Sequence, residues 1–214
     1  MNGTQEIEQF FETQASSIQE RYFAALDGLK ANVEFSDQER LDRANVVREL
    51  SSRERAAALE SRNAALEKRE QDLRRRLFGA PVGYKDGVAV QSAAFTDALT
   101  RATLASGEDL QKLSEVAAQT GDQALGKAVF VAAEQRGMPD LALAYLNSNP
   151  DVSAAYGELA SMPNAEERQA AAENPGFPPL KIEQVRPSFE DIQRAEHGKR
   201  MERIDAQDAY MNNS

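Results

Sequence analysis

The stretch ERAAALESRNAALEKREQDLRRRLFG, residues 54–79, decides the fold, because it is the clearest part of one very long helix. No Gly or Pro interrupts the chain from about Asp37 to Phe78, which predicts a helix about 60 Å long at 1.5 Å per residue. Ser36 and Glu39 form a capping-box pattern at its start, and the Gly79-Ala80-Pro81 sequence ends it. Most helical stability comes from packing, so a helix of this length needs a second surface.

Leucines recur every seven residues within this stretch, which is the spacing of a coiled coil. Placing these leucines at heptad position d puts an Asn and a further Leu at position a, where a buried Asn fixes the register of a dimer. The sequence therefore predicts a seam by which two copies associate. The residues of this predicted oligomerisation seam are Leu59, Asn63, Leu66, Leu73 and Leu77.

Charged residues flank the predicted seam in the arrangement typical of parallel strands. Arg55 and Arg62 lie at g, and Glu60 and Glu67 lie at e, so that each Arg can pair with a Glu of the other chain. Glu70 falls at a, however, and weakens the end of the seam. Three such heptads do not hold two chains together alone, so an oligomer also needs the first helix or an outside scaffold.

The first segment predicts another helix, over about residues 4–33, with a broad apolar stripe that must be covered. One alternative to self-association is therefore a hairpin within one chain, in which residues 4–33 lie on residues 37–66. Another is a bare charged helix exposed to solvent. Self-association is the favoured interpretation, and a hairpin can also dimerise. The stripe consists of Ile7, Phe10, Phe11, Ile18, Tyr22, Leu26, Leu29 and Val33.

The rest of the chain predicts an all-α protein with a compact domain of short helices. Residues 1–80 form the hairpin or coiled-coil region, and residues 81–91 are a hinge in which Asp86-Gly87 can turn a small β-hairpin. Helix stops at regular intervals divide residues 92–174 into short helices around one core. Residues 175–187 contain four prolines and predict an extended segment, and residues 188–214 predict a C-terminal helix. We expect five aromatic or aliphatic side chains to dock partners: Phe10, Phe11, Tyr22, Phe189 and Ile192.

The composition disfavours several classes of partner and chemistry. The 214 residues carry a net charge of −10 and no Cys, which argues against wholesale phosphate binding and excludes thiol chemistry. Glu residues interleave with the basic ones around Arg74-Arg75-Arg76, so nucleic acid is disfavoured as a partner. No apolar run approaches the length of a membrane span, and the N-terminus is acidic where a signal peptide is basic. We expect no membrane partner.

No motif predicts catalysis, a cofactor or a metal site. The GDQALGKA sequence at 121–128 matches a phosphate-binding loop only in part, because Ala128 stands where Ser or Thr binds magnesium and the preceding segment predicts a helix. His197 is the only histidine, and a single imidazole without partners makes neither a triad nor a metal site. Adjacent carboxylates such as Glu108-Asp109 fall at helix starts, where they favour the helix dipole. We expect a protein that is not an enzyme and has no cofactor and no small-molecule substrate.

The segment TGDQALGKAVFVAAEQRGMPDLALAYLNSNPDVSAAYGELA, residues 120–160, resembles a helical segment of structural or assembly proteins of tailed phages. It shows a glycine-capped Ala-rich helix, a Gly-x-Pro turn and a helix closed by Asn-Pro. The resemblance covers about a fifth of the chain and implies a role in capsid, neck or tail construction. Scaffolding proteins of this kind have a basic C-terminal helix, whereas here acidic residues offset Arg194, Lys199, Arg200 and Arg203.

The resulting expectation is a non-enzymatic structural or assembly protein that self-associates or docks on a larger assembly of structural proteins. The resemblance implies a phage particle, with the protein in the host cytoplasm during assembly or in the virion. The alternative is a cytosolic helical adaptor that binds a partner helix or peptide through residues 92–174.

Overall fold

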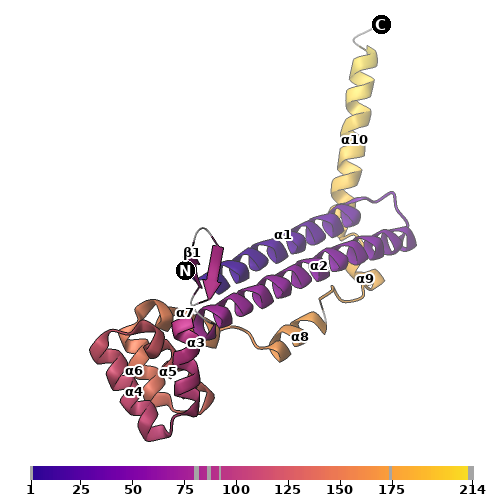
Figure 1. Ribbon diagram of the computed structural model, residues 1–214. Coiled ribbons are helices and arrows are strands. Elements are labelled where there is room, and N and C mark those ends of the chain that lie inside the picture. The colour runs from indigo at the N-terminus through magenta and orange to yellow at the C-terminus, as the bar shows by residue number, and fades with distance from the viewer. Residues whose placement is uncertain (1, 80–81, 86–87, 92, 174, 212–214) are drawn as a thin grey trace. The chain divides into compact units, whose positions relative to one another are not determined.

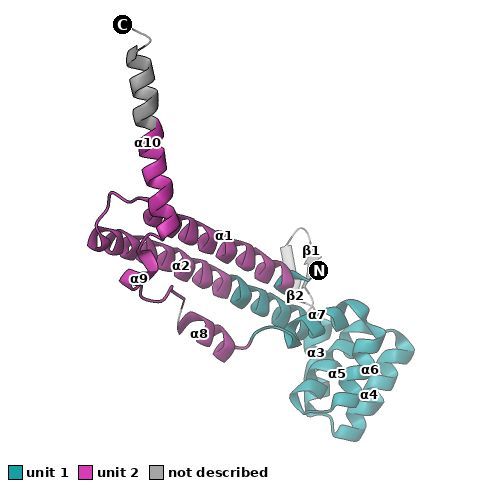
Figure 2. Cartoon of the chain, turned by 180° about the vertical axis from the view of Figure 1, so that it is seen from behind, with its two compact units in different colours: residues 1–4, 65–163 teal, residues 5–64, 164–214 magenta. Residues whose placement is uncertain are grey.

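The computed structural model describes residues 2–79, 82–85, 88–91, 93–173 and 175–211, with side chains described outside the two strands and up to Met201 (Figure 1). The chain divides into two compact units (Figure 2): unit 1 contains residues 1–4 and 65–163, and unit 2 contains residues 5–64 and 164–214. The long helix α2, Asp37–Phe78, contributes its last turns to unit 1 and its remainder to unit 2.

Unit 1 is a domain of short helices whose ends are set by local sequence. Gly121 and Gly137 adopt left-handed backbone conformations, with φ of 68° and 63°, which only Gly adopts without strain. The Asp122 carboxylate caps the next helix by accepting a hydrogen bond from the Leu125 N–H at 3.0 Å. The helices are α3 Ala93–Leu104, α4 Gly107–Thr120, α5 Gln123–Gln135, α6 Pro139–Ser148 and α7 Pro150–Ala160.

Helix α5 is the centre of unit 1 and packs against α3, α4 and α6. The Phe130 ring is fully buried and stacks on Phe78 and on Tyr145, with ring centroids 5.9 and 5.2 Å apart. The last turns of α2 bury Leu73 and Leu77 together with residues of α7. The core of unit 1 therefore needs the end of the long helix.

A two-stranded antiparallel ribbon joins α2 to α3, with β1 at Val82–Lys85 and β2 at Val88–Gln91. Val82 pairs with Gln91, and Lys85 pairs with Val88. The sequence allows either a small hairpin or a plain hinge in this region, and the structure pairs the two strands. The turn that a hairpin would make at residues 86–87 lies outside the described residues.

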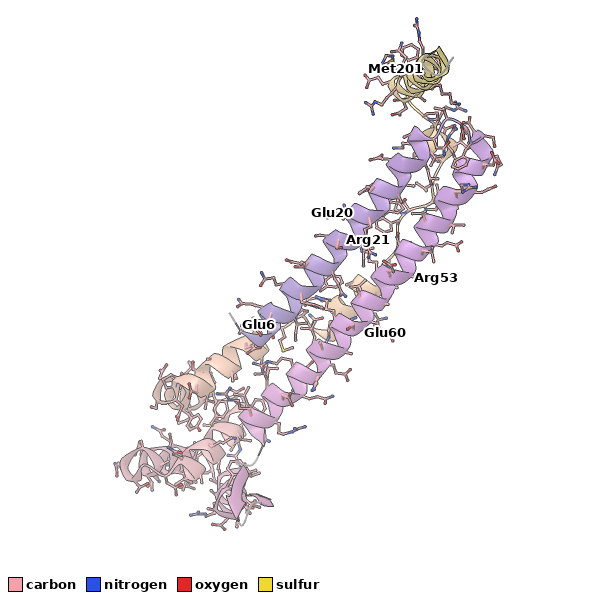
Figure 3. The ribbon with its side chains drawn as sticks, turned by 90° about the horizontal axis from the view of Figure 1, so that it is seen from above. Glu6, Glu20, Arg21, Arg53, Glu60 and Met201 are labelled. Carbon is pink, nitrogen blue, oxygen red and sulfur yellow. The ribbon has the colours of Figure 1, made fainter. Side chains whose placement is uncertain are left out.

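Unit 2 is built on a helical hairpin, in which α1, Gly3–Ala31, runs antiparallel to α2 (Figures 1 and 3). The predicted capping box starts α2: the Glu39 carboxylate accepts from the Ser36 N–H at 2.9 Å, and Ser36 Oγ accepts from the Glu39 N–H at 3.3 Å. The hydrogen bonds that the Ser36 N–H and, at 2.8 Å, Ser36 Oγ donate to the carboxylate lower the pKa of Glu39. The chain thereby reverses over a short connection.

The Pro-rich segment 175–187, here called the strap, returns along this hairpin. The Phe177 ring stacks on Tyr22 with centroids 4.0 Å apart, and the Phe177 N–H donates to Ser52 Oγ at 3.0 Å. Val185 is fully buried in a cluster with Leu26 and other residues of α1 and α2. The helices that precede, end and follow the strap are α8 Ala165–Glu173, α9 Ile182–Val185 and α10 Phe189–Met211.

The expected fold class is confirmed: the protein is all-α apart from the short ribbon, with two long N-terminal helices followed by short helices and a C-terminal helix. The division into units differs from the expected domain at 92–174. Residues 65–78 join the domain of short helices because Leu73, Leu77 and Phe78 enter its core, whereas α8 belongs to unit 2. Among the described residues, no helix has the length and apolar character needed to cross a membrane.

Candidate functional site

An arginine stands at every seventh position of α2, at Arg48, Arg55, Arg62, Arg69 and Arg76, here called the arginine ladder. Seven residues are nearly two helical turns, so these side chains share one face of the helix. The heptad pattern of the sequence predicts that Arg55 and Arg62 of this ladder pair with Glu residues of a second chain. The structure instead gives several of these arginines acceptors within one chain.

Arg62 pairs with α1 rather than with a second copy. Its Nε and Nη2 donate to the two carboxylate oxygens of Glu8 at 2.7 and 2.6 Å, a bidentate pair. The Arg55 guanidinium lies 5.7 Å from the centroid of the Phe177 ring in the strap. Glu60 and Glu67, which were expected to pair with these arginines across an interface, are exposed.

Arg69 binds a buried carboxylate in unit 1. Glu158 of α7 is 6% exposed and accepts from Arg69 Nε and Nη2 at 2.9 and 2.8 Å. It also accepts from the Thr4 N–H at 2.8 Å and from Thr4 Oγ1 at 2.9 Å. The hydrogen bonds from Arg69 are the largest cause that lowers the pKa of Glu158 to about 2, against the opposing effect of burial. This carboxylate is saturated by structural partners and is not a general base.

The predicted oligomerisation seam is buried within the single chain, which corrects its assignment as a surface between two copies. Leu59, Leu66, Leu73 and Leu77 are between 0% and 6% exposed, and the half-buried Asn63 donates to the Arg168 carbonyl at 3.5 Å. The physical reason is that the heptad stripe finds its cover in the same chain. For Leu73 and Leu77, that cover is α7.

The expected docking residues fall into two groups. Tyr22 is 3% exposed beneath the strap, and Phe11 is half-buried under Arg62, whose guanidinium lies 5.3 Å from the ring centroid. Neither side chain offers a free docking surface, and Tyr22 is corrected to a core residue. Phe10, Phe189 and Ile192 are exposed, as docking requires.

The side of the hairpin away from the strap carries a groove of about 350 Å³ between α1 and α2. On α2, Glu54 and Ser61 lie about 200° and 180° around the helix from Ser52, which the strap contacts. Figure 3 shows the two helices side by side, with Arg21 on α1 next to α2. Here called the open face, this surface is lined by Gln14, Ser17, Ile18, Arg21, Glu54, Ala57, Ala58 and Ser61.

Exposed apolar residues extend the open face at helical spacing. Phe10 stands one turn before Gln14, and Leu50 and Val46 stand one and two turns before Glu54. These three apolar side chains are 66%, 54% and 58% exposed. Half of the residues that line the groove between them are small, namely Ser17, Ala57, Ala58 and Ser61, so another helix can approach closely there.

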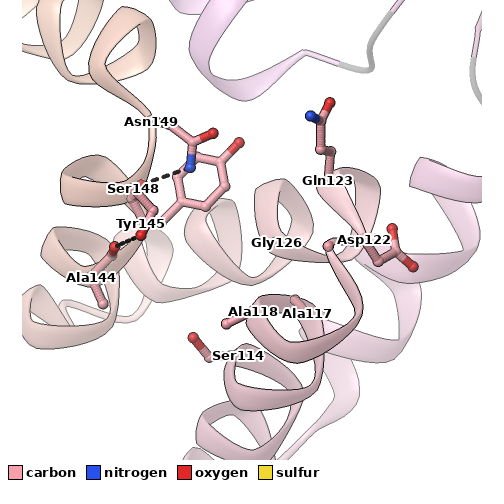
Figure 4. A pocket seen from close by; sticks show the side chains of 11 residues that line it. Ser114, Ala117, Ala118, Asp122, Gln123, Gly126, Ala144, Tyr145, Ser148 and Asn149 are labelled. Atoms are coloured by element: carbon pink, nitrogen blue, oxygen red, sulfur yellow. Dashed lines mark hydrogen bonds between the residues drawn. The ribbon is translucent and has the colours of Figure 1, made fainter.

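Unit 1 has a separate cleft of about 380 Å³ between α4, α5 and α6 (Figure 4). The Tyr145 ring forms one side next to Gly126, and Ala117 and Ala118 line another side. A Cβ at Gly126 would come within 3.2 Å of the Tyr145 ring, so Gly allows this close approach. Burial raises the pKa of Tyr145, which keeps its phenol neutral.

The residues that resembled a phosphate-binding loop have structural roles. Gly121 ends α4, Asp122 caps α5, and the Lys127 ammonium donates to the Arg76 carbonyl at 2.9 Å. His197 lies exposed on α10. Over the described ranges, no group of three Asp, Glu or His side chains is arranged to hold a metal ion.

The small residues of the open face are not among the site residues predicted from the sequence. Their signal was present, because Ser17, Ala24 and Gly28 on α1 and Ala57 and Ser61 on α2 follow helical spacing. That pattern was outweighed by the leucine repeat, which pointed to the opposite side of α2.

Comparisons of the chain with protein-family models, with curated proteins and with solved structures found no match. The proposed function therefore rests on the surfaces of the protein itself and on the sequence resemblance of residues 120–160.

Proposed function

We propose that this protein is a non-enzymatic assembly protein that acts by binding other protein surfaces through the open face of its α1/α2 hairpin. One observation carries the proposal: the strap covers one side of this hairpin, whereas the other side carries a groove that no described segment of the chain fills. A groove lined in part by small residues and with an apolar rim fits a helix.

The energetic argument concerns the three large apolar side chains of the rim. Single exposed apolar residues are common, but Phe10, Val46 and Leu50 stand one or two helical turns from residues that line the groove rather than scattered over the surface. Burying one such side chain stabilises a complex by roughly 1.5–3 kcal/mol before the cost of association. Three of them can therefore support a specific contact.

The resemblance of residues 120–160 to structural proteins of tailed phages supports a phage particle as the assembly. On this proposal the protein is a component of, or a scaffold for, a capsid, neck or tail. It resides in the host cytoplasm during assembly or in the virion.

Photo-crosslinking in the protein's native extract tests this function. Ser17 lines the open face and also borders the outer hollow of α1, whereas Ser16 lines only that outer hollow, with Thr13 and Glu20, and is the matched position for a second crosslinker. We expect protein adducts from Ser17 and few from Ser16, with the Ser17 adduct in the fast-sedimenting fractions of a density gradient. A protein that stays free of any assembly and gives no adduct at Ser17 contradicts the proposal.

The cleft of unit 1 favours a second candidate function, an adaptor that binds a peptide through residues 92–174. Its volume of about 380 Å³ falls in the range of small-ligand sites, and its lining mixes small apolar residues with hydroxyl and amide groups. An Ala118→Phe substitution fills the cleft, whereas Ala154→Phe places the same ring on an exposed part of α7. Peptides selected from a library on the full chain should lose binding only with Ala118→Phe.

A further inference from the structure

We propose that the occupant of the open face is a second copy of this chain, related by a two-fold axis parallel to α1 and α2, so that each α1 lies over the α2 of the other copy. This inference rests on the proposed function, because it names the partner of the same surface. In this dimer the two chains contact each other through the side of α2 that lies opposite the leucine repeat.

The contacts within the hairpin define which residues of α1 and α2 lie at the same level. Glu8 is level with Arg62, and Arg21 is level with Glu54, because these pairs are hydrogen-bonded at 2.6–2.8 Å. For a residue of α1 and a residue of α2 at the same level, the two residue numbers therefore add up to between 70 and 75. By this rule Phe10 is level with Ser61, and Leu50 is level with Ala24 and Ala25.

At each end of the open face, one helix carries large side chains and the other helix carries small ones. At one end α1 carries the large Phe10, while α2 carries the small Ser61 and Ala64. Toward the other end the sizes are reversed. There α2 carries Val46 and Leu50, while α1 carries the small Ala24, Ala25 and Gly28, and a Cβ at Gly28 would meet nothing within 4 Å.

A two-fold axis parallel to the helices makes this asymmetry complementary. Such an axis places α1 over the other copy's α2 at the same level, so that Phe10 meets Ser61 and Leu50 meets Ala24. Large side chains then fill the spaces above small ones at both ends, as close packing requires. A surface that is complementary to itself in this way fits a second copy of the same chain.

The charged side chains of the open face favour this axis over a two-fold axis that runs perpendicular to the helices, here called the crossing axis. Both axes place large residues over small ones, but a crossing axis puts Arg21 near Gln14 and Glu54 near Ala57. The parallel axis puts Arg21 of each copy over Glu54 of the other copy, which gives two such pairs. Within one chain Arg21 already pairs with Glu54 at 2.8 Å, and both side chains are more than half exposed, at 64% and 51%. In the dimer the two pairs can therefore join into one cluster of two Arg and two Glu side chains, and the face stays neutral in a chain of net charge −10.

Charge reversal with complementation tests this geometry. Arg21→Glu gives a face with two acidic groups, and Glu54→Arg gives a face with two basic groups, so each variant repels its own copy. A mixture restores opposite charges at both positions of a heterodimer. In sedimentation equilibrium we expect each variant alone to dimerise at least about tenfold more weakly than the unchanged chain, and the equimolar mixture to recover most of that loss.

The control is the exposed ion pair between Lys112 and Glu108 on α4, reversed one residue at a time in the same way. These variants should dimerise like the unchanged chain, and circular dichroism should show that all variants are folded. A mixture of the Arg21 and Glu54 variants that stays monomeric while the unchanged chain dimerises overturns the proposed axis.

Disulfide formation gives a second, independent readout, because the chain contains no Cys of its own. Ser17→Cys mixed with Ala57→Cys should form a crosslinked heterodimer under the parallel axis, whereas Ser17→Cys alone should crosslink only under the crossing axis. An unchanged chain that is monomeric at every concentration refutes the second copy as occupant. Adducts from Ser17 to a different protein would still support the proposed function in that case.

Discussion

The Glu158 carboxylate shows at the scale of one residue how a charge is held inside unit 1. Burial alone disfavours a charged carboxylate, but four hydrogen bonds from Arg69 and Thr4 more than compensate, so the pKa falls to about 2. The same contacts tie α2 and the start of the chain to α7. A carboxylate in this position therefore contributes stability rather than chemistry.

We predict that Glu158→Gln lowers the free energy of unfolding by about 2 kcal/mol at pH 7, because a neutral amide replaces the acceptor of charge-assisted hydrogen bonds. The value is modest because the Arg69 side chain is 35% exposed and can be rehydrated. Urea denaturation measures the change. Asp97→Asn is the control, since its ion pair with Arg101 is exposed and lies outside the open face, so it should change stability by less than about 0.5 kcal/mol.

The pH dependence of this difference has a defined sign. The pKa of Glu158 is lowered from 4.5 to about 2 in the folded state, so folding disfavours protonation of this group. Its contribution is complete above pH 4.5 and is lost as the pH falls toward 2. The gap in stability between the unchanged chain and Glu158→Gln should therefore shrink over this range, and a gap that widens would refute the assignment.

At the scale of one element, α2 carries leucines with opposite roles on its two sides. Leu73 is 1% exposed in the core shared with α7, whereas Leu50 is 54% exposed on the open face. The same substitution at these two positions therefore separates a role in folding from a role in association.

We predict that Leu73→Ala destabilises the protein by about 3 kcal/mol, because it leaves a cavity in a packed core. Leu50→Ala should change stability by less than about 0.5 kcal/mol and should weaken dimerisation instead. Thermal unfolding and sedimentation equilibrium of both variants provide the measurements. Equal loss of stability in the two variants would show that the open face is not a free surface.

The strap gives a second prediction at this scale. Phe177 of the strap stacks on Tyr22 of α1. Phe177→Ala should therefore destabilise unit 2 by about 3 kcal/mol and increase amide hydrogen exchange in residues 175–187. Phe189→Ala removes an equally large ring that is 73% exposed, and it should change stability by less than about 0.5 kcal/mol. Unchanged exchange in the Phe177→Ala strap would show that other contacts hold it.

At the scale of the whole molecule, a larger side chain on the open face should weaken association without changing the folding of the single chain. Gly28 and Gly157 are both helical glycines with open space at the Cβ position. Replacing either by Leu should leave folding intact or improve it by about 0.8 kcal/mol, because Leu has the higher helix propensity. Only Gly28 lies on the open face.

We therefore predict that Gly28→Leu weakens dimerisation by at least about tenfold, because its side chain occupies the space that Val46 or Leu50 of the other copy would fill. Gly157→Leu should dimerise like the unchanged chain. Sedimentation equilibrium at several concentrations compares the two variants, and identical dimerisation would exclude this part of the face from the interface.

The sequence by itself determined the elements whose signals are local. The absence of Gly and Pro from Asp37 to Phe78, the capping box at Ser36 and the stop at Gly79 set the ends of α2 within a residue or so. Gly121, Gly137 and Asp122 likewise set the ends of short helices in unit 1. Such signals act over four or five residues, so they can be recognised without knowledge of the remaining fold.

Only the tertiary structure decided what covers the leucine repeat and which side of α2 remains free. A heptad of leucines demands an apolar cover, but it does not say whether the cover comes from another chain or from the same one. Glu8 and Glu158 lie 54 and 89 positions from the arginines that bind them. The short turn between α1 and α2 favours the intrachain choice, because it holds α1 beside α2 at a high effective concentration that a second copy must match.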